Sequence, residues 1–253
     1  MKITIKKKLL RLVGCFMSFS NESHLFIIAQ ARSGSSLLMH ILCSNDEILG
    51  FGEEFTIFKN EDDLNNSAHY IRLKNFDFFK PYKYLAHQIT ANNRTPNIEL
   101  LAKKNVKNII LVRNPESVIK SMSSIAKKNY ADSSEKEIIN YYINRLKFQK
   151  SLFNNLPEES RLLLRYEDLL SNSETALNEL ADFLKLKTPL KSKYKLQKFT
   201  QISGDPSIHI LSGSIKPTPE YNLEINSNLL KIADLEYQTF FQDIKNYNER
   251  KNE

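Results

Sequence analysis

The sequence predicts an α/β fold, a three-layer sandwich in which helices cover both faces of a mostly parallel sheet. Short apolar runs alternate along the chain with segments whose apolar residues recur at helical spacing. Such alternation is typical of parallel sheets built from strand, helix and strand units. With 253 residues, 41% of them hydrophobic and 26% charged, the chain suits one large folded domain.

Residues 1–20 are expected to form a basic extension, followed by a single domain over residues 21–253. Lysines at positions 6 to 8 precede an apolar stretch that resembles the start of a signal peptide but lacks a small-residue cleavage site. We expect the extension to pack against the domain, with contact to a membrane surface or a partner as the alternative. No stretch of the chain approaches the ~20 apolar residues of a membrane span.

The first strand, turn and helix of the domain form a candidate anion site. Residues 25–29 are an apolar run that predicts a buried strand, residues 31–34 turn the chain, and two serines at 35–36 open an apolar helix. The first turn of a helix leaves backbone N–H groups without partners and carries partial positive charge. This arrangement predicts a cradle for a phosphate or a sulfate ester.

The residue types in this turn suit an anion. Gly34 lets the backbone approach a ligand, and Arg32 supplies a forked, permanently charged clamp. Further hydroxyl donors come from Ser33, Ser35 and Ser36. The turn fits the nucleotide-binding pattern G-x-x-x-x-G-K-[ST] only in part, because Ser35 stands in place of the lysine. Ordinary hydrolysis of ATP or GTP is therefore disfavoured.

The middle of the domain predicts two further strands. Residues 48–58 follow the first helix, and a polar stretch rich in Asn and Asp comes next. Residues 84–89 predict a strand, and the apolar run at 108–112 predicts the clearest one after the first. Pro115 is placed to begin the helix that follows.

A second arginine and a second serine follow the strand at 108–112. Arg113 ends that strand, and Ser121 lies on the second turn of the next helix. In an open parallel sheet, ligands gather at the carboxyl ends of the strands. Arg113 and Ser121 are therefore well placed to hold a second anion.

The last third of the domain continues the alternation. Ser134 and Glu137 have the spacing of a capping box, residues 161–165 predict a short strand, and Ser173 is expected to cap the next helix. An amphipathic helix is expected near residues 228–244.

The segment between these last two helices, residues 186–225, shows little periodicity. It carries the lysines Lys187, Lys191, Lys193, Lys195 and Lys198. A loop this long is usually functional or disordered, so it is interpreted either as a solvated lysine surface or as a lid over an anion.

The charge balance favours an anionic ligand. The net charge is +7 and the pI is about 9.2. Zinc-finger spacing, an arginine-rich arm and a basic aromatic stripe are all absent from the sequence, so no nucleic-acid partner is expected. Cys15 and Cys43 are far apart and form no metal pattern, which predicts reduced thiols in a cytoplasmic protein and no bound metal.

The two arginine-containing turns together resemble those of the sulfotransferases that use 3′-phosphoadenosine 5′-phosphosulfate (PAPS). In that family a loop of the form R-S-G-T/S-T/S binds the 5′-phosphosulfate. Its counterparts here are Arg32, Ser33, Gly34, Ser35 and Ser36. A second motif holds the 3′-phosphate, with an arginine, then Asp or Asn, then Pro, and a serine eight positions after the arginine. The positions that meet this pattern are Arg113, Asn114, Pro115 and Ser121.

The resemblance implies a P-loop-like sulfotransferase fold of the bacterial or carbohydrate type, with PAPS as the co-substrate and no metal. Such an enzyme would move a sulfuryl group in line to a hydroxyl or amine of a glycan or small-molecule acceptor. Arg32 would then be catalytic as well as cofactor-binding, because it would stabilise the charge that develops on the bridging oxygen.

An acceptor hydroxyl also needs a general base, and the sequence offers two candidates. Glu53 lies in a Phe-Gly-Glu match to bacterial and carbohydrate sulfotransferases, with Glu54 as its immediate alternative. His87, near the end of the strand at 84–89, resembles in location the base of cytosolic small-molecule sulfotransferases. Leu85 replaces the lysine that those enzymes carry two positions before the histidine, so we favour Glu53.

Weaker matches extend the resemblance to about residue 225. Residues 165–169 resemble the Y-E-D-L segment of the family, in which we expect Glu167 and Asp168 to orient the next helix. Residues 204–206 resemble a late G-N-P turn, but Ile208 stands where an arginine often follows.

Two other functions stay open at this point. A P-loop nucleotide kinase or phosphotransferase would fit the first turn but not the missing lysine or the second motif. A non-catalytic PAPS-binding protein of the same fold would explain both turns and the departures at Leu85 and Ile208. We expect acceptor specificity to lie in residues 60–84 and in the lysine-rich segment.

Overall fold

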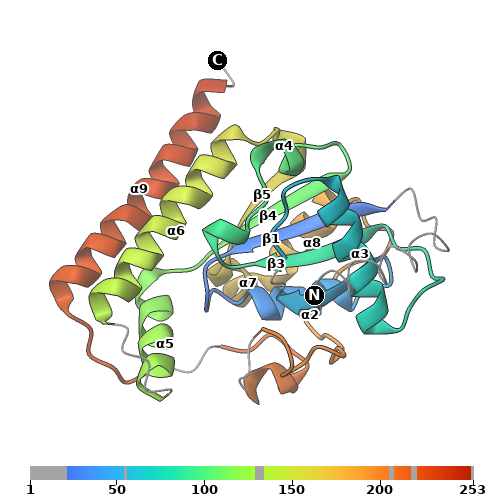
Figure 1. The fold of residues 1–253 in the computed structure, drawn as a ribbon. Coiled ribbons are helices and arrows are strands. Elements are labelled where there is room, and N and C mark those ends of the chain that lie inside the picture. The colour runs from blue at the N-terminus through green and yellow to red at the C-terminus, as the bar shows by residue number, and fades with distance from the viewer. Residues whose placement is uncertain (1–21, 54–55, 129–133, 205–207, 218–220, 252–253) are drawn as a thin grey trace, which may run out of the picture.

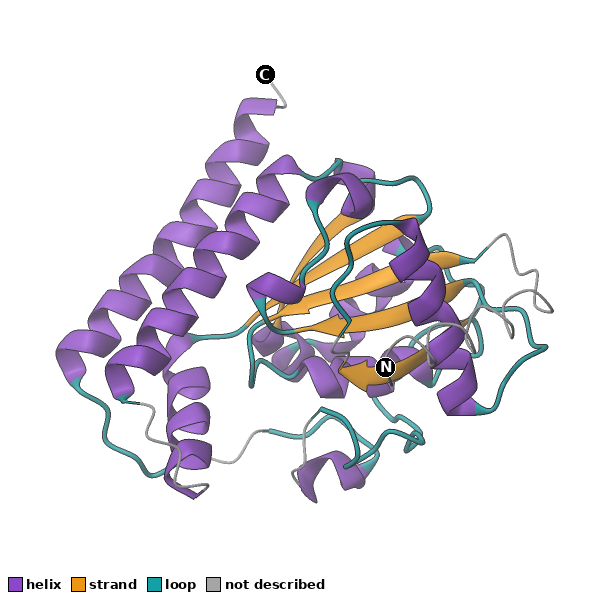
Figure 2. Cartoon of the chain, viewed as in Figure 1, coloured by secondary structure: helices purple, strands orange, loops and turns teal. Residues whose placement is uncertain are grey.

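The described strands form one all-parallel sheet at the centre of the molecule (Figures 1 and 2). The computed structural model describes residues 22–253 apart from 54–55, 129–133, 205–207, 218–220 and 252–253, so the predicted extension at 1–20 lies outside the described residues. The strand order is β2-β3-β1-β4-β5. The strands are β1 (Ser23–Ala29), β2 (Ile48–Glu53), β3 (Tyr84–Ile89), β4 (Val106–Val112) and β5 (Arg161–Arg165). The predicted α/β class with a parallel sheet is confirmed.

The central strand β1 is buried on both faces, which explains the unbroken apolar run at residues 25–29. Leu25 and Ile27 face one hydrophobic cluster, whereas Phe26 and Ile28 face another on the opposite side of the sheet. β1 pairs in parallel with β3 and with β4. The segments that follow β1 and β4 therefore emerge side by side at the same edge of the sheet.

Helices cover both faces, as the three-layer prediction requires. Helices α2 (Ser35–Cys43), α7 (Tyr166–Ser171) and α8 (Ser173–Phe183) contribute to the cluster with Leu25. Helices α4 (Ile98–Leu101), α5 (Pro115–Lys128), α6 (Glu135–Asn155) and α9 (Ser227–Lys251) contribute to the cluster with Phe26. Helix α3 (Glu61–Asn75) contributes one buried apolar residue to each cluster. The long helices α6 and α9 lie side by side (Figure 1).

Several local signals act as the sequence predicts. Helix α5 begins at Pro115. The Ser134 hydroxyl accepts a hydrogen bond from the Glu137 backbone N–H, while the Glu137 carboxylate accepts one from the Ser134 N–H, which completes the capping box of α6. Ser173 differs from expectation, because it is the first residue of α8, and the N-cap is Asn172, whose side chain makes no capping bond.

Strand β2 and helix α3 were not predicted from the sequence. The first six residues of the 48–58 segment form the edge strand β2, and the polar stretch that follows contains helix α3 (Glu61–Asn75). The Asn60 side chain caps α3 by accepting from the Asp63 N–H. The apolar residues of α3 show only a weak helical periodicity in the sequence, because the helix buries few apolar side chains, mainly Leu64 and Ile71.

The late segment runs without long regular structure. It contains a short 3-10 helix at Ile208–Ser212 and an isolated antiparallel bridge between Lys193 and Ser214. Among the described helices, none is both long and apolar enough to span a membrane.

Candidate active site

The two predicted anion turns meet at a topological switch point of the sheet. Strands β1 and β4 are neighbours, but the chain leaves β1 through α2 toward β2 and leaves β4 through α5 toward β5, on opposite sides. Such a divergence opens a crevice beyond the carboxyl ends of the two strands. The turn containing Arg32 and the start of α5 after Arg113 flank this crevice.

The turn after β1 has a backbone that favours glycine at one position. Gly34 has φ +90°, and a Cβ atom there would lie 2.3 Å from a ring carbon of Tyr166. Gly34 is also the N-cap of α2, so no side chain occupies the space before the first-turn N–H groups. Arg32 adopts φ +64°, and the Ser33 hydroxyl donates to the Gln30 carbonyl at 2.7 Å, which closes the turn.

The hydroxyl groups of Ser35 and Ser36 are positioned from the neighbouring strand. The side-chain amide of Gln88 donates to the Oγ atom of Ser35 at 3.0 Å and to that of Ser36 at 3.3 Å. Because the serine oxygens accept from Gln88, the Ser35 hydroxyl hydrogen can point toward a ligand. Gly204 packs closely on the Ser36 hydroxyl, since a Cβ atom at position 204 would lie 2.5 Å from the Ser36 Oγ atom.

Arg113 is a nearly buried cation with spare donor capacity. Its side chain is 6% exposed, its Nη1 atom donates to the Arg32 carbonyl at 3.0 Å, and its guanidinium lies 4.4 Å from the centre of the Tyr166 ring. The Nε atom has no hydrogen-bond partner among the described residues. Burial lowers the pKa of Arg113. The nearby side chains of Tyr166, Glu167 and Tyr221 act in the opposite direction and limit this decrease. A buried guanidinium with an unused donor fits an anionic ligand.

Ser121 joins the two turns directly. Its Oγ atom accepts from the Arg32 Nε atom at 3.0 Å and donates to the Tyr221 hydroxyl at 3.3 Å. The Glu167 carboxylate accepts from the Asn114 backbone N–H at 2.9 Å and from its side-chain amide at 2.7 Å. Glu167 therefore orients the start of α5, beyond the role that the sequence predicted for it within its own segment.

One cavity of about 100 Å³ lies between these groups. Of the residues expected to bind the cofactor, Arg32, Gly34, Ser35, Ser36, Arg113 and Ser121 line it. Ser33 is buried within the turn. The sequence did not identify the lining residues Tyr166, Tyr194, His209, Ser214, Lys216 and Tyr221. Most of these belong to the late segment, which walls the cavity, while its action as a lid stays a prediction.

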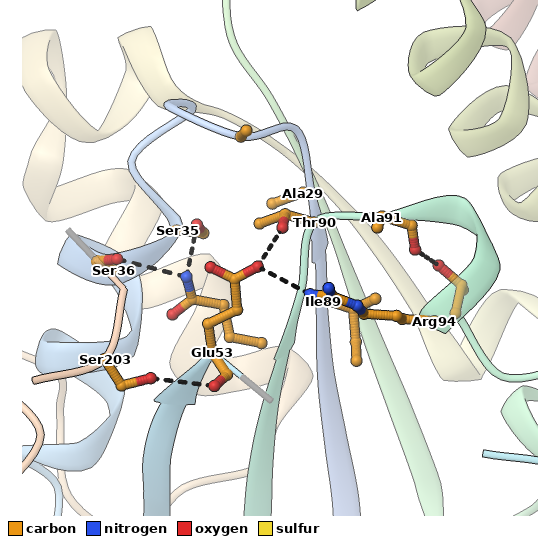
Figure 3. A network of polar contacts seen from close by, with 12 residues as sticks. Ala29, Ser35, Ser36, Glu53, Ile89, Thr90, Ala91, Arg94 and Ser203 are labelled. Carbon is orange, nitrogen blue, oxygen red and sulfur yellow. Dashed lines mark hydrogen bonds and ion pairs between the residues drawn. The ribbon is translucent and has the colours of Figure 1, made fainter. Parts of the chain in front are cut away.

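Glu53 lies at the carboxyl end of β2 and is not among the residues that line this cavity. Its carboxylate accepts a hydrogen bond from the Thr90 hydroxyl and lies 3.8 Å from the Arg94 Nη1 atom, and its carbonyl accepts from the Ser203 hydroxyl at 3.0 Å. Figure 3 shows the Glu53 side chain near Ser35, on the loop side of the sheet. The alternative acid, residue 54, lies outside the described residues.

His87 is not brought to the cavity. It is 0% exposed, and its ring nitrogens lie 2.9 Å from His24 Nδ1 and 3.2 Å from the Ser67 hydroxyl. Its ring also stacks on Phe26, with 4.6 Å between the ring centres. Side chains alternate across a strand, so Gln88 faces the serine hydroxyls and His87 faces the opposite layer. Within the described part of the chain, no group of three His, Cys, Asp or Glu side chains is arranged to hold a metal.

Comparison with known proteins identifies the family and the fold of this chain. The family model described as the sulfotransferase domain matches residues 22–212. The solved sulfotransferase domain of the Synechococcus PCC 7002 olefin synthase is 17% identical, covers 85% of this chain and 94% of its own, and superposes with a TM-score of 0.60. The sulfotransferase domain of the curacin biosynthetic pathway is also 17% identical. It covers 85% of this chain and 97% of its own, with a TM-score of 0.49.

The olefin synthase domain shows the same fold at low identity, which confirms the predicted P-loop-like sulfotransferase fold. A search among curated proteins gives no match. The family match spans most of the chain and contains the Arg32 turn, Glu53 and the Arg113 motif. The chain therefore belongs to the sulfotransferase domain family.

Proposed function

We propose that this sulfotransferase moves a sulfuryl group from PAPS to a hydroxyl or amine of a glycan or small-molecule acceptor. The observation that carries the proposal is the direct contact between the two anion turns. Arg32 donates to Ser121, and Arg113 donates to the Arg32 carbonyl, across one cavity. Two permanent cations in one cavity suit a ligand with two separate anionic groups.

The lining residues divide naturally between the two ends of such a ligand. The first-turn N–H groups of α2, with Arg32 and the Ser35 hydroxyl, would hold the 5′-phosphosulfate. The unpaired Nε atom of Arg113 and the hydroxyl of Ser121 would hold the 3′-phosphate. Bound PAPS supplies the sulfuryl group and a leaving group whose new charge Arg32 would stabilise.

Glu53 is proposed as the general base. The Thr90 hydroxyl and the Arg94 guanidinium both contact the Glu53 carboxylate, which fixes its position beside the serine turn. A carboxylate held in this way can accept the acceptor's proton as the new bond to sulfur forms. We assign no proton transfer to His87, because it is buried in the opposite layer and both its ring nitrogens are engaged.

A kinase-like activity has less support. Ser35 stands where a P-loop kinase would carry its phosphate-binding lysine, and the chain belongs to the sulfotransferase domain family. Carbohydrate as the acceptor and the cytoplasm as the location stay predictions.

Calorimetry and a transfer assay test the proposal together. The protein is titrated with adenosine 3′,5′-bisphosphate (PAP) and, separately, with magnesium ATP, and sulfate transfer from labelled PAPS is then screened over sugar, hydroxyl and amine acceptors. We expect PAP to bind at least about 100-fold more tightly than ATP, because only PAP places a phosphate at Arg113. Tight ATP binding without PAP binding would overturn the assignment. PAP binding without transfer to any acceptor would support a non-catalytic protein instead.

A further inference from the structure

Arg145 is a buried cation on α6 that neither turn motif includes. It is 1% exposed and lies against the carboxyl ends of β1 and β3. Its Nε atom donates to the Ala29 carbonyl at 2.9 Å, and its Nη2 atom donates to the Ile89 carbonyl at 3.0 Å. Its Nη1 atom donates to the Asn92 side-chain oxygen at 2.7 Å and to the Thr95 hydroxyl at 3.1 Å. The guanidinium is thus well bonded, but only to neutral groups.

A second buried arginine shows what a compensated charge looks like in this protein. Arg72 is also 1% exposed, and it donates to backbone carbonyls as Arg145 does, but it forms an ion pair with Glu22. No described carboxylate pairs with Arg145. Burial lowers the pKa of Arg145 to about 10, so the side chain still carries its charge at neutral pH. The charge of Arg72 is cancelled locally, whereas that of Arg145 is not.

Burying a cation without a counter-ion costs free energy, so its retention calls for a compensating anion. The turn after β1 is a candidate place for such an anion, since Arg145 binds Ala29, the last residue of that strand. Helix α6 reaches the turn at a second point, because the Tyr141 hydroxyl accepts from the Ala31 backbone N–H at 2.8 Å. The two contacted residues, Ala29 and Ala31, lie within three residues before Arg32.

The same two side chains also hold the segment after β3. Tyr141 donates to the Thr90 carbonyl at 2.8 Å, and Arg145 binds Ile89 on one side of Thr90 and Asn92 on the other. Thr90 in turn donates to the Glu53 carboxylate. Arg145 therefore fixes both the turn that would hold the phosphosulfate and the support of the proposed base.

We propose that Arg145 is a positioning residue whose buried charge is compensated by the 5′-phosphosulfate end of the ligand. It acts through the turn after β1 and does not touch the reacting atoms. This inference rests on the proposed function, because it needs an anion on that turn. It predicts that Arg145 supports the 5′ end of the ligand and not the 3′ end, which Arg113 and Ser121 serve.

The test compares adenosine 5′-phosphate with adenosine 3′-phosphate, each titrated by calorimetry into the intact protein. Arg145→Gln keeps several hydrogen-bonding groups but removes the charge, whereas Arg145→Lys keeps the charge with fewer hydrogen bonds. We expect Arg145→Gln to weaken binding of the 5′-phosphate roughly tenfold and that of the 3′-phosphate less than about twofold. Arg145→Lys should keep the 5′-phosphate affinity within about threefold of the original.

Gln149 gives a matched control on the same face of α6. Its amide donates to the Ile28 carbonyl at 2.9 Å and to the Leu111 carbonyl at 3.0 Å, and it carries no charge. Gln149→Leu should change the affinities for the two phosphates alike, because it removes only hydrogen bonds. Thermal unfolding of each variant shows whether the fold is kept.

Equal losses for the Gln and Lys variants, or equal losses at both phosphates, would overturn the proposal and leave a structural role. Failure of both variants to fold would do the same. If the original protein binds neither adenosine phosphate nor PAP, the proposed function is wrong, and this inference is then wrong as well. If it binds them and Arg145→Gln changes nothing, only the inference fails.

Discussion

The carboxyl edge of the sheet has two sides that differ in their charged groups. The anion side, formed by Arg32, Arg113 and Ser121 after β1 and β4, carries two guanidinium groups and open N–H groups at the start of α2. The base side, formed by Glu53 with Thr90 and Arg94, pairs one carboxylate with one guanidinium. Arginine keeps its charge at all ordinary pH values, while a carboxylate can take up a proton. Binding is therefore assigned to the two arginines, and proton transfer to the carboxylate.

The two sides also differ in how deeply their charged side chains are buried. Arg113 is 6% exposed and packed on Tyr166, whereas the Glu53 side chain is 23% exposed. The anion side is built into the core and should be sensitive to any change of shape. The base side is open enough for an acceptor to reach it. Substitutions on the anion side should therefore lower the affinity for PAP, whereas substitutions on the base side should lower kcat.

The largest effect is expected from Glu53→Gln. Loss of a positioned general base lowers kcat by roughly 10²- to 10⁴-fold. Affinity for PAP should stay within about twofold, since Glu53 contacts neither Arg32 nor Arg113 in the described interactions. Labelled sulfate transfer and calorimetry give the two values.

Glu54→Gln is the matched control for that experiment. We expect it to retain most of the transfer activity. Full activity in Glu53→Gln together with inactivity in Glu54→Gln would move the base by one residue.

The next largest effect is expected from Gly34→Ala on the anion side. Alanine at φ +90° is strained, and its Cβ atom would meet the Tyr166 ring at 2.3 Å. PAP affinity should fall roughly 10- to 100-fold as the start of α2 shifts. Calorimetry measures the loss, and the pH dependence of kcat should keep its shape because the base side is unchanged. An unaltered PAP affinity would show that the turn is not the binding element.

A smaller effect separates acid inactivation of the base side from acid unfolding of the core. Burial and the neighbouring His87 lower the pKa of His24 from 6.5 to about 3. Below pH 6.5 the unfolded state therefore binds more protons, and stability falls by about 1.4 kcal/mol per pH unit as the pH drops toward 3. Urea unfolding at pH 6.5 and 4.5 should show this loss.

His24→Gln should flatten that dependence, while His209→Gln, at an exposed position, should keep it. A steep loss of stability in His24→Gln would show that other groups control acid unfolding. The comparison then separates acid unfolding of the core from any acid loss of activity in the folded protein.

The strongest local patterns in the sequence predicted well the strands and helix starts from which the anion side is built. Residues 25–29 and 108–112 read as strands because they are buried on both faces, and Pro115 and the Ser134 capping box marked helix starts through local chemistry. The two arginines follow those strands directly. Their meeting at one edge follows from the parallel sheet.

The base side and the supporting residues were harder to predict, because their contacts are distant along the chain. Gln88 lies 53 residues from Ser35, and Arg145 lies 116 residues from Ala29. A strand pattern also leaves open which of His87 and Gln88 faces the turn, since adjacent side chains point to opposite faces. The Y-E-D-L resemblance could have signalled Tyr166, which stacks on Arg113.

The central claim is that the two turns form one site for a doubly phosphorylated ligand, and Arg113→Ala tests it most directly. Calorimetry with PAP and with adenosine 5′-phosphate should show PAP affinity reduced roughly 100-fold, because a charge-assisted contact to the 3′-phosphate is lost. Adenosine 5′-phosphate should bind within about threefold of its original affinity. Unchanged PAP affinity, or equal loss for both ligands, would contradict the assignment of Arg113 to the 3′-phosphate.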